Sequence, residues 1–115
     1  PNFDPNTPVF TFWAALSQKL ASRSNDVVFY LTPGRYTPNN FFGLYELPAL
    51  LQGTSRAKLL AVLNVITPGM ARCGAGQLRD LETLVKQRRP ALQYKCHDTD
   101  GSVDALVKII KSYLP

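Results

Sequence analysis

The sequence predicts an α/β fold, a small three-layer domain with a short, mostly parallel sheet covered by helices. Helix-like and strand-like patterns alternate along the chain, as they do in folds built from β-α-β units. Two strand-like stretches, residues 27–31 and 59–66, are apolar on both faces, which is typical of buried parallel strands. The 115 residues, 45% hydrophobic and 18% charged, suffice for one core, so residues 1–115 should form a single domain.

The first part of the chain is expected to be an arm followed by a helix. Residues 1–6 are polar and should be loosely held, and because the chain begins at Pro1 we expect a processed or excised product. Thr7 and Pro8 are typical of a helix start. Apolar residues then recur at helical spacing, which predicts a helix over residues 8–22.

A strand, a long loop and a short helix should follow. The β-branched and aromatic residues at 27–31 predict the first strand. A loop rich in Pro and Asn then runs to Asn40, and long loops inside compact domains are usually functional. The short helix is expected over residues 46–52, and Pro48 restricts it because proline is tolerated only in a first turn.

The second half of the chain repeats the alternation. Residues 59–66 predict a second buried strand, residues 76–89 a helix with one apolar stripe, and residues 92–96 a half-exposed strand. Ser102 should cap a last helix. Its inward face is expected to carry Val103, Leu106, Val107, Ile110 and Tyr113.

Charge and hydropathy narrow the choice of partners. The net charge is +5, from 13 Lys and Arg against 8 Asp and Glu, but the basic residues are scattered and only residues 86–89 form a cluster. A solvated basic surface therefore explains the charge better than nucleic-acid binding, which we do not expect. No apolar stretch is long enough for a membrane span.

Two cysteines and one histidine offer little for metal or nucleophilic chemistry. Cys73 and Cys96 lack metal-ligand spacing, so no metal site is predicted. They are either free thiols of a cytosolic protein or one disulfide of about 3 kcal/mol, which would imply an oxidising compartment. His97 has no matched acid or nucleophile and is expected in an exposed loop, whereas Tyr30 and Tyr94 should pack on strands.

Glu46 is the candidate with the most chemical interest. It is one of two glutamates and lies among Phe41, Phe42 and Tyr45. A carboxylate in such surroundings is either a helix N-terminal charge or a group kept in a pocket, where desolvation raises its energy unless a cation neutralises it. Ligands of parallel sheets bind beyond the carboxyl ends of the strands, and the loop that carries Arg35 and leads to Glu46 should lie there.

Four stretches match a known family in the family's order and at nearly its spacing. They are residues 6–13 with Ser17 a turn later, residues 26–28, the Phe-Gly-x-x-Glu motif at residues 42–46, and Cys73 with Cys96. On these residues the chain resembles the C-terminal half of the ADP-ribosyl cyclase and NAD+ glycohydrolase family. The resemblance covers residues 6 to about 98, and the helical N-terminal half of the family has no counterpart.

The resemblance implies NAD+, or alternatively NADP+, as a substrate and requires no separate cofactor. Glu46 aligns with the catalytic glutamate that stabilises the ribosyl cation, and Trp13 with a tryptophan that stacks on nicotinamide. Ser17 aligns with a phosphate contact and Phe42 with a residue that lines that site. Phe41 stands where the family commonly has a small hydroxyl residue, which removes one polar contact.

The remaining expectations also follow from the resemblance. Arg35, Lys19 and Arg56 are the candidates to replace the phosphate-binding arginine that the missing half supplies, and Tyr45 is included among the substrate-binding residues. Cys73 and Cys96 match a family disulfide. We expect hydrolysis to ADP-ribose and nicotinamide with little cyclisation, by a secreted toxin or effector that can be delivered into a target cell and is countered by an inhibitor or immunity protein. The alternative is an inactive module that binds NAD or ADP-ribose, or a basic interaction module, on the same scaffold.

Overall fold

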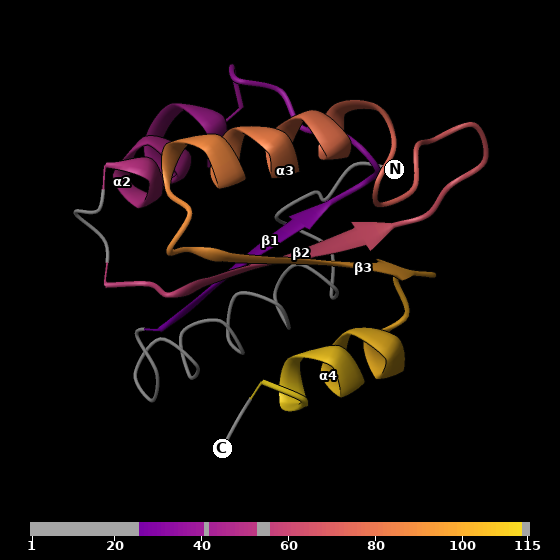
Figure 1. The fold of residues 1–115 in the computed structure, drawn as a ribbon. Coiled ribbons are helices and arrows are strands. Elements are labelled where there is room, and N and C mark those ends of the chain that lie inside the picture. Colours follow the sequence, from indigo (N-terminus) through magenta and orange to yellow (C-terminus); the bar gives the residue numbers. More distant parts are fainter. Residues whose placement is uncertain (1–25, 41, 53–55, 114–115) are drawn as a thin grey trace.

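The computed structural model describes residues 26–40, 42–52 and 56–113 (Figure 1). The elements are β1 (Val27–Thr32), a π-helical turn η1 (Phe42–Glu46), α2 (Leu47–Leu51), β2 (Leu59–Val65), α3 (Gly76–Arg88), β3 (Gln93–Thr99) and α4 (Val103–Lys111). Each strand and helix expected between residues 27 and 113 is present. The helix expected over residues 8–22 lies outside the described residues.

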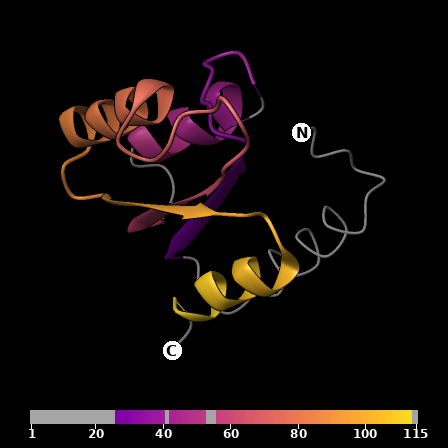
Figure 2. The ribbon, with the colours of Figure 1, turned by 90° about the vertical axis from the view of Figure 1, so that its right-hand side faces the viewer.

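The three strands form a parallel sheet in the order β1-β2-β3, which confirms the predicted fold class. Val28 is aligned with Leu60, and Leu60 with Tyr94, so β2 is the central strand. Figures 1 and 2 show α2 and α3 on one face of the sheet and α4 on the other. The three layers follow from β2, which is apolar on both faces and must be covered on both.

Alternation along the strands divides the buried residues between the two faces of the sheet. Leu60 and Val62 belong to the cluster on the side of α2 and α3. That cluster also contains Tyr30, Phe42, Leu47, Leu50, Ala57, Leu78, Leu81, Val85 and Leu92. Ala61 and Leu63 alternate to the side of α4, because successive side chains of a strand point to opposite faces.

Two expectations about the C-terminal part were wrong. Val103 was expected to face inward, yet it is 38% exposed, because it is the first residue of α4 and lies in the turn next to the cap. His97 was expected in an exposed loop, yet it is a half-buried residue of β3 whose Nε2 shares a hydrogen bond with the hydroxyl of Tyr113. The strand runs three residues further than the pattern indicated. The cap is confirmed, because the hydroxyl of Ser102 accepts from the backbone N–H of Ala105 at 3.2 Å.

The two cysteines form a disulfide, as the family resemblance implied. Cys73 and Cys96 lie 5.8 Å apart at their Cα atoms and join the loop after β2 to β3. Asp98 reinforces this link, since its carboxylate accepts from the N–H of Cys73 at 3.0 Å and from the amide of Asn64 at 2.9 Å. The loop is therefore tied to two strands.

Candidate functional site

The Phe-Gly-x-x-Glu motif forms a single π-helical turn that leads directly into α2. The turn spans Phe42–Glu46, and α2 begins at Leu47 with Pro48 in its first turn, as expected from the sequence. Single π-turns are rare and are frequently found at functional sites. Glu46 stands at the junction of the two helical segments, where its side chain makes no capping hydrogen bond.

Gly43 has a steric reason for its place in the motif. A Cβ atom built on it would lie 2.5 Å from the carbonyl oxygen of Thr37 and 2.8 Å from the Cα of Pro38. Both neighbours are backbone atoms, so they cannot rotate away. The preceding loop therefore packs against the turn at a distance that only glycine allows.

Phe42 anchors the turn to the sheet. Its side chain is 3% exposed, and its ring stacks on Tyr30 of β1 with 3.9 Å between centroids and 7° between planes. Tyr36 meets the same ring edge-on at 6.4 Å. In this position Phe42 packs in the core, and direct contact with a substrate would require the ring to leave it.

Glu46 borders a small apolar pocket. The other described lining residues are Val28, Ala49 and Leu50, and the volume is about 190 Å³. Glu46 as a residue is exposed, yet the apolar neighbours partly desolvate its carboxylate, which raises the pKa of Glu46. Among the described residues the carboxylate of Glu46 has no salt-bridge or hydrogen-bond partner. A partly desolvated carboxylate without a partner is stabilised by a cationic ligand.

The pocket does not lie where the sequence predicted it. Glu46 was expected beyond the carboxyl ends of the strands, yet Val28 is the second residue of β1, so the pocket borders the amino-terminal half of that strand. The physical reason is the course of the chain. The loop after β1 turns back, and α2 lies over the beginning of the edge strand (Figure 1).

Two other predicted site residues that the structure describes, Arg35 and Tyr45, do not line the pocket of Glu46. Arg35 is exposed, and its backbone carbonyl accepts hydrogen bonds from the hydroxyls of Tyr30 and Thr32. Tyr45 is 65% exposed on the turn. Neither is among the described lining residues of the pocket. Trp13, Ser17 and Phe41 lie outside the described residues, so their binding roles stay predictions.

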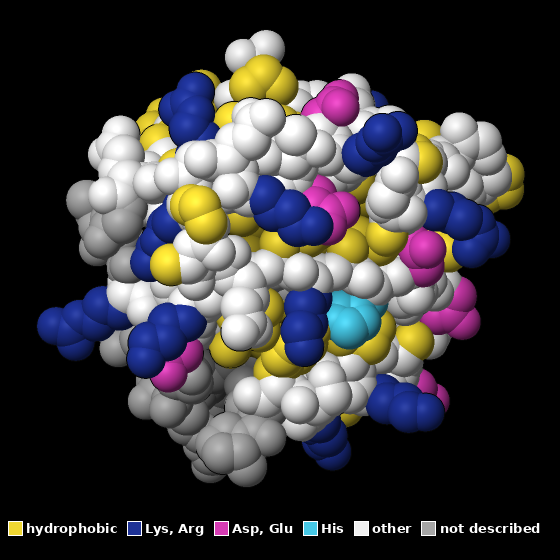
Figure 3. Space-filling view, viewed as in Figure 1, with side chains coloured by type: hydrophobic (Ala, Val, Ile, Leu, Met, Phe, Trp, Pro, Cys, Tyr) yellow, Lys and Arg dark blue, Asp and Glu magenta, His cyan; other side chains and the backbone are white. Residues whose placement is uncertain are grey.

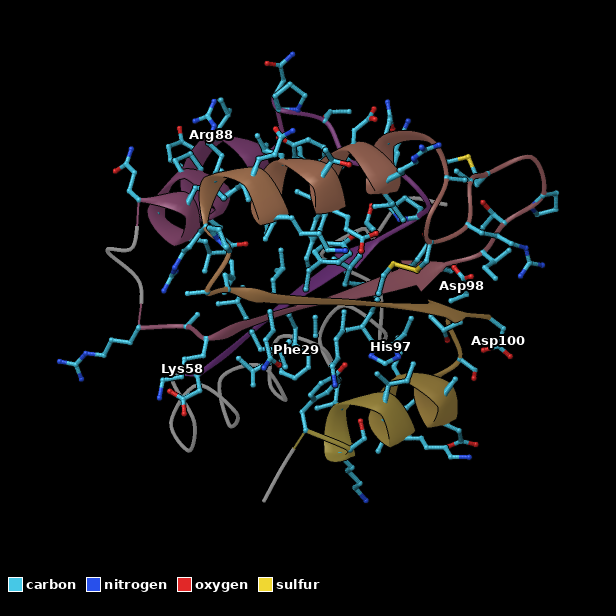
Figure 4. The ribbon with its side chains drawn as sticks, viewed as in Figure 1. Phe29, Lys58, Arg88, His97, Asp98 and Asp100 are labelled. Carbon is cyan, nitrogen blue, oxygen red and sulfur yellow. A yellow bond between two sulfur atoms is a disulfide. The ribbon has the colours of Figure 1, made fainter. Side chains whose placement is uncertain are left out.

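Sequence reasoning missed the apolar walls of the pocket. The sequence pattern indicated only that Val28 belongs to a strand and that Ala49 and Leu50 belong to a short helix. A second hollow of about 230 Å³ lies between α2 and α3, and Arg88 at its rim (Figure 4) is the one charged residue among its described lining. It contains no carboxylate, so the pocket of Glu46 is the better candidate for a cation.

The molecular surface has no large area of a single charge on the face seen in Figure 3. Lys and Arg side chains are separated there by polar, acidic and apolar residues. No helix within the described ranges is long and apolar enough to cross a membrane. The same residues contain no cluster of His, Cys, Asp and Glu that could hold a metal ion.

The fold and site define a small α/β domain with one carboxylate, that of Glu46, among the described residues that line an apolar pocket. The chain belongs to the ADP-ribosyl cyclase family, whose sequence profile matches residues 2–111. This confirms the resemblance found in the sequence.

Two curated relatives are the ADP-ribosyl cyclase/cyclic ADP-ribose hydrolases of two Aplysia species. The protein of Aplysia californica is 36% identical over 84 residues, which cover 68% of this chain and 30% of the relative. The protein of Aplysia kurodai is 34% identical over 99 residues, which cover 81% and 34%. The chain thus spans about a third of the length of these relatives.

Solved structures agree with the sequence match. Aplysia cyclase in complex with the substrate NGD and the product cGDPR is 29% identical, with a TM-score of 0.56, over 98% of this chain and 46% of that protein. An ADP-ribosyl cyclase in complex with N1-cIDPR gives the same identity and TM-score over 97% and 46%. The similarity is to the C-terminal part of these structures, as the sequence indicated. In the first complex NGD is a substrate rather than a cofactor.

Proposed function

We propose that this domain hydrolyses the nicotinamide–ribose bond of NAD+ and releases nicotinamide and ADP-ribose. The observation that carries the proposal is the carboxylate of Glu46, which lies beside an apolar pocket with no partner among the described residues. Membership of the ADP-ribosyl cyclase family supports the choice of substrate.

The chemistry asks little of the protein. The leaving group is a pyridinium that departs as neutral nicotinamide, so the general acid of ordinary glycosidases is not needed. Positive charge develops on the ribose, and one negative charge held close to it lowers the barrier. By analogy with a single electrostatic group of an oxyanion hole, this is worth roughly 10²–10³ in rate. Glu46 must be ionised for this role, so activity should fall on acidification through its raised pKa.

The size of the pocket favours hydrolysis over cyclisation. Small-molecule sites usually enclose about 300–1,000 Å³, and the pocket of Glu46 encloses about 190 Å³. A pocket of this size suits the reacting end of NAD+ and gives less shelter to a folded-back adenine, which cyclisation needs. We propose that Trp13 stacks on the nicotinamide and that Ser17 contacts the diphosphate.

The disulfide supports a secreted protein. Bonds such as Cys73–Cys96 persist in oxidising compartments and are rare in the cytosol. A small domain that destroys NAD+ suits a toxin or effector, and such a protein would require an inhibitor or immunity protein in the cell that makes it. This role rests on the proposed activity.

The proposal is tested by product analysis with both glutamates. NAD+ is incubated with wild type, Glu46→Gln and Glu82→Gln, and the products are separated by chromatography. Glu82 is the matched control, because it pairs with Lys86 at 2.9 Å on the surface of α3. We expect Glu46→Gln to lower nicotinamide release at least about 100-fold and Glu82→Gln to leave it unchanged. Full activity of folded Glu46→Gln would refute the mechanism.

A module that binds NAD+ without cleaving it would give a different experimental result. The chain spans less than half of the solved relatives, so binding without turnover is the second candidate. Calorimetry would then detect NAD+ or ADP-ribose binding to wild type while chromatography finds intact NAD+. A basic interaction module predicts neither binding nor turnover.

A further inference from the structure

We propose that Asn40 is the positioning residue of Glu46: its side-chain amide clamps the π-turn between β1 and the pocket. This inference deepens the proposed function and rests on it for its kinetic consequences. Asn40 ends the loop that leads to the motif and lies two residues before Phe42, but no sequence pattern assigned a role to its side chain.

Asn40 makes hydrogen bonds on both sides of its side-chain amide. Its Oδ1 accepts from the backbone N–H of Gly43 at 2.8 Å, and its Nδ2 donates to the hydroxyl of Tyr30 at 2.9 Å. Its backbone carbonyl also accepts from the N–H of Leu44 at 2.9 Å. Three bonds from one residue thus fix the start of the turn.

The direction of these bonds follows from chemistry. The N–H of Gly43 can only donate, so the atom of Asn40 that faces it must be the oxygen. The amide nitrogen then faces Tyr30, whose hydroxyl accepts from it and donates onward to the carbonyl of Arg35 at 3.3 Å. Aspartate could keep the first bond but would lose the donor for the second.

Tyr30 holds the turn at two points. Its ring stacks on Phe42 at 3.9 Å, and its hydroxyl holds Asn40. Val28, two residues earlier on the same face of β1, forms a wall of the pocket of Glu46. The clamp and the pocket wall therefore come from one strand, so the clamp sets the distance between Glu46 and that wall.

Loss of the clamp should move Glu46 more than it unfolds the domain. A displacement of about 1 Å far from the reacting atoms can cost roughly 10²-fold in rate. A looser turn also admits water to the carboxylate, which reduces the desolvation that raises the pKa of Glu46. Both changes can be measured separately.

The experiment uses ¹³C-labelled glutamate. The chain has two glutamates, Glu46 and Glu82, so an NMR titration shows two side-chain carboxyl signals. One variant is enough to assign each signal to its residue. The variants are Asn40→Ala, Asn40→Asp and Tyr30→Phe. Asn39→Ala is the matched control, because Asn39 is the exposed neighbour without a recorded hydrogen bond among the described residues.

We expect Asn40→Ala and Tyr30→Phe to bring the pKa of Glu46 toward its ordinary value and to lower kcat for NAD+ about 10- to 100-fold, with KM changed less than about threefold. Asn40→Asp should be intermediate. Asn39→Ala and the signal of Glu82 should match wild type. Tyr30→Phe keeps the ring stack, so it reports on the clamp even if Asn40→Ala fails to fold.

Two outcomes overturn the inference. One is an unchanged titration of Glu46 in Asn40→Ala and Tyr30→Phe, and the other is an equal effect of Asn39→Ala. If wild type does not consume NAD+, the proposed function fails, yet the titration still decides whether Asn40 positions Glu46.

Discussion

Arg89 should contribute more to stability than its basic neighbour. Its guanidinium donates to the carbonyl of Leu50 at 2.6 Å and to that of Ala57 at 3.0 Å. One side chain at the end of α3 therefore holds the end of α2 and the approach to β2. A hydrogen bond from a charged group is worth roughly 1.5–3 kcal/mol. Because Arg89 is only half-buried, we take the lower value for each bond and expect Arg89→Met to cost about 3 kcal/mol.

This loss is large for a domain of 115 residues, since natural domains of this kind are stable by about 5–15 kcal/mol. Urea unfolding followed by circular dichroism measures it. Arg88→Met is the matched control, because Arg88 is exposed at the adjacent position and has no recorded hydrogen bond among the described residues (Figure 4). Arg89→Lys keeps the charge and one bond, so it should lose about half as much. If Arg89→Met is no less stable than Arg88→Met, the two bonds do not hold the domain together.

Two further predictions concern the disulfide and pH. Replacing Cys73 and Cys96, which are 23 positions apart, by serine should cost about 3 kcal/mol in urea unfolding; an unchanged midpoint would show that the Asp98 contacts suffice. Burial, and then the charge of Lys95, lower the pKa of His97, so the unfolded chain binds more protons below about pH 6.5 and stability should fall as the pH drops below that value. His97→Gln should flatten the dependence of the unfolding free energy on pH between pH 7.5 and 5.5. A profile identical to that of wild type would show that His97 does not cause this dependence.

The sequence predicted the sheet because local pattern and tertiary role agree there. Residues 59–66 are apolar on both faces, and only a central parallel strand buries both. The pattern failed where an element extends past the core. Val103 fits the helical spacing of α4 but lies in its first turn, and β3 continues through His97 although its residues become polar.

The site was harder to predict, because its geometry depends on the path of a loop. Glu46 could be identified from its motif, but its place beside Val28 depends on the reversal of the chain between residues 33 and 40. Spacing along the sequence carries no information about that reversal. The bond between Asn40 and Tyr30 has the same origin, since the two residues are ten positions apart and meet only through the loop.

The described residues of the pocket come from one short part of the sequence. This matters for the question of whether part of the family fold can carry out the proposed reaction by itself. All described walls of the pocket come from residues 28 to 50, so the desolvation of Glu46 needs no contribution from the part of the relatives that this chain does not span. What the described site lacks is volume, because about 190 Å³ cannot enclose a whole dinucleotide. Binding energy from the remote end of NAD+ should therefore be reduced more than the stabilisation of the transition state at the ribose. Under the proposed activity, the domain should differ from its longer relatives mainly through a higher KM, with a smaller difference in kcat.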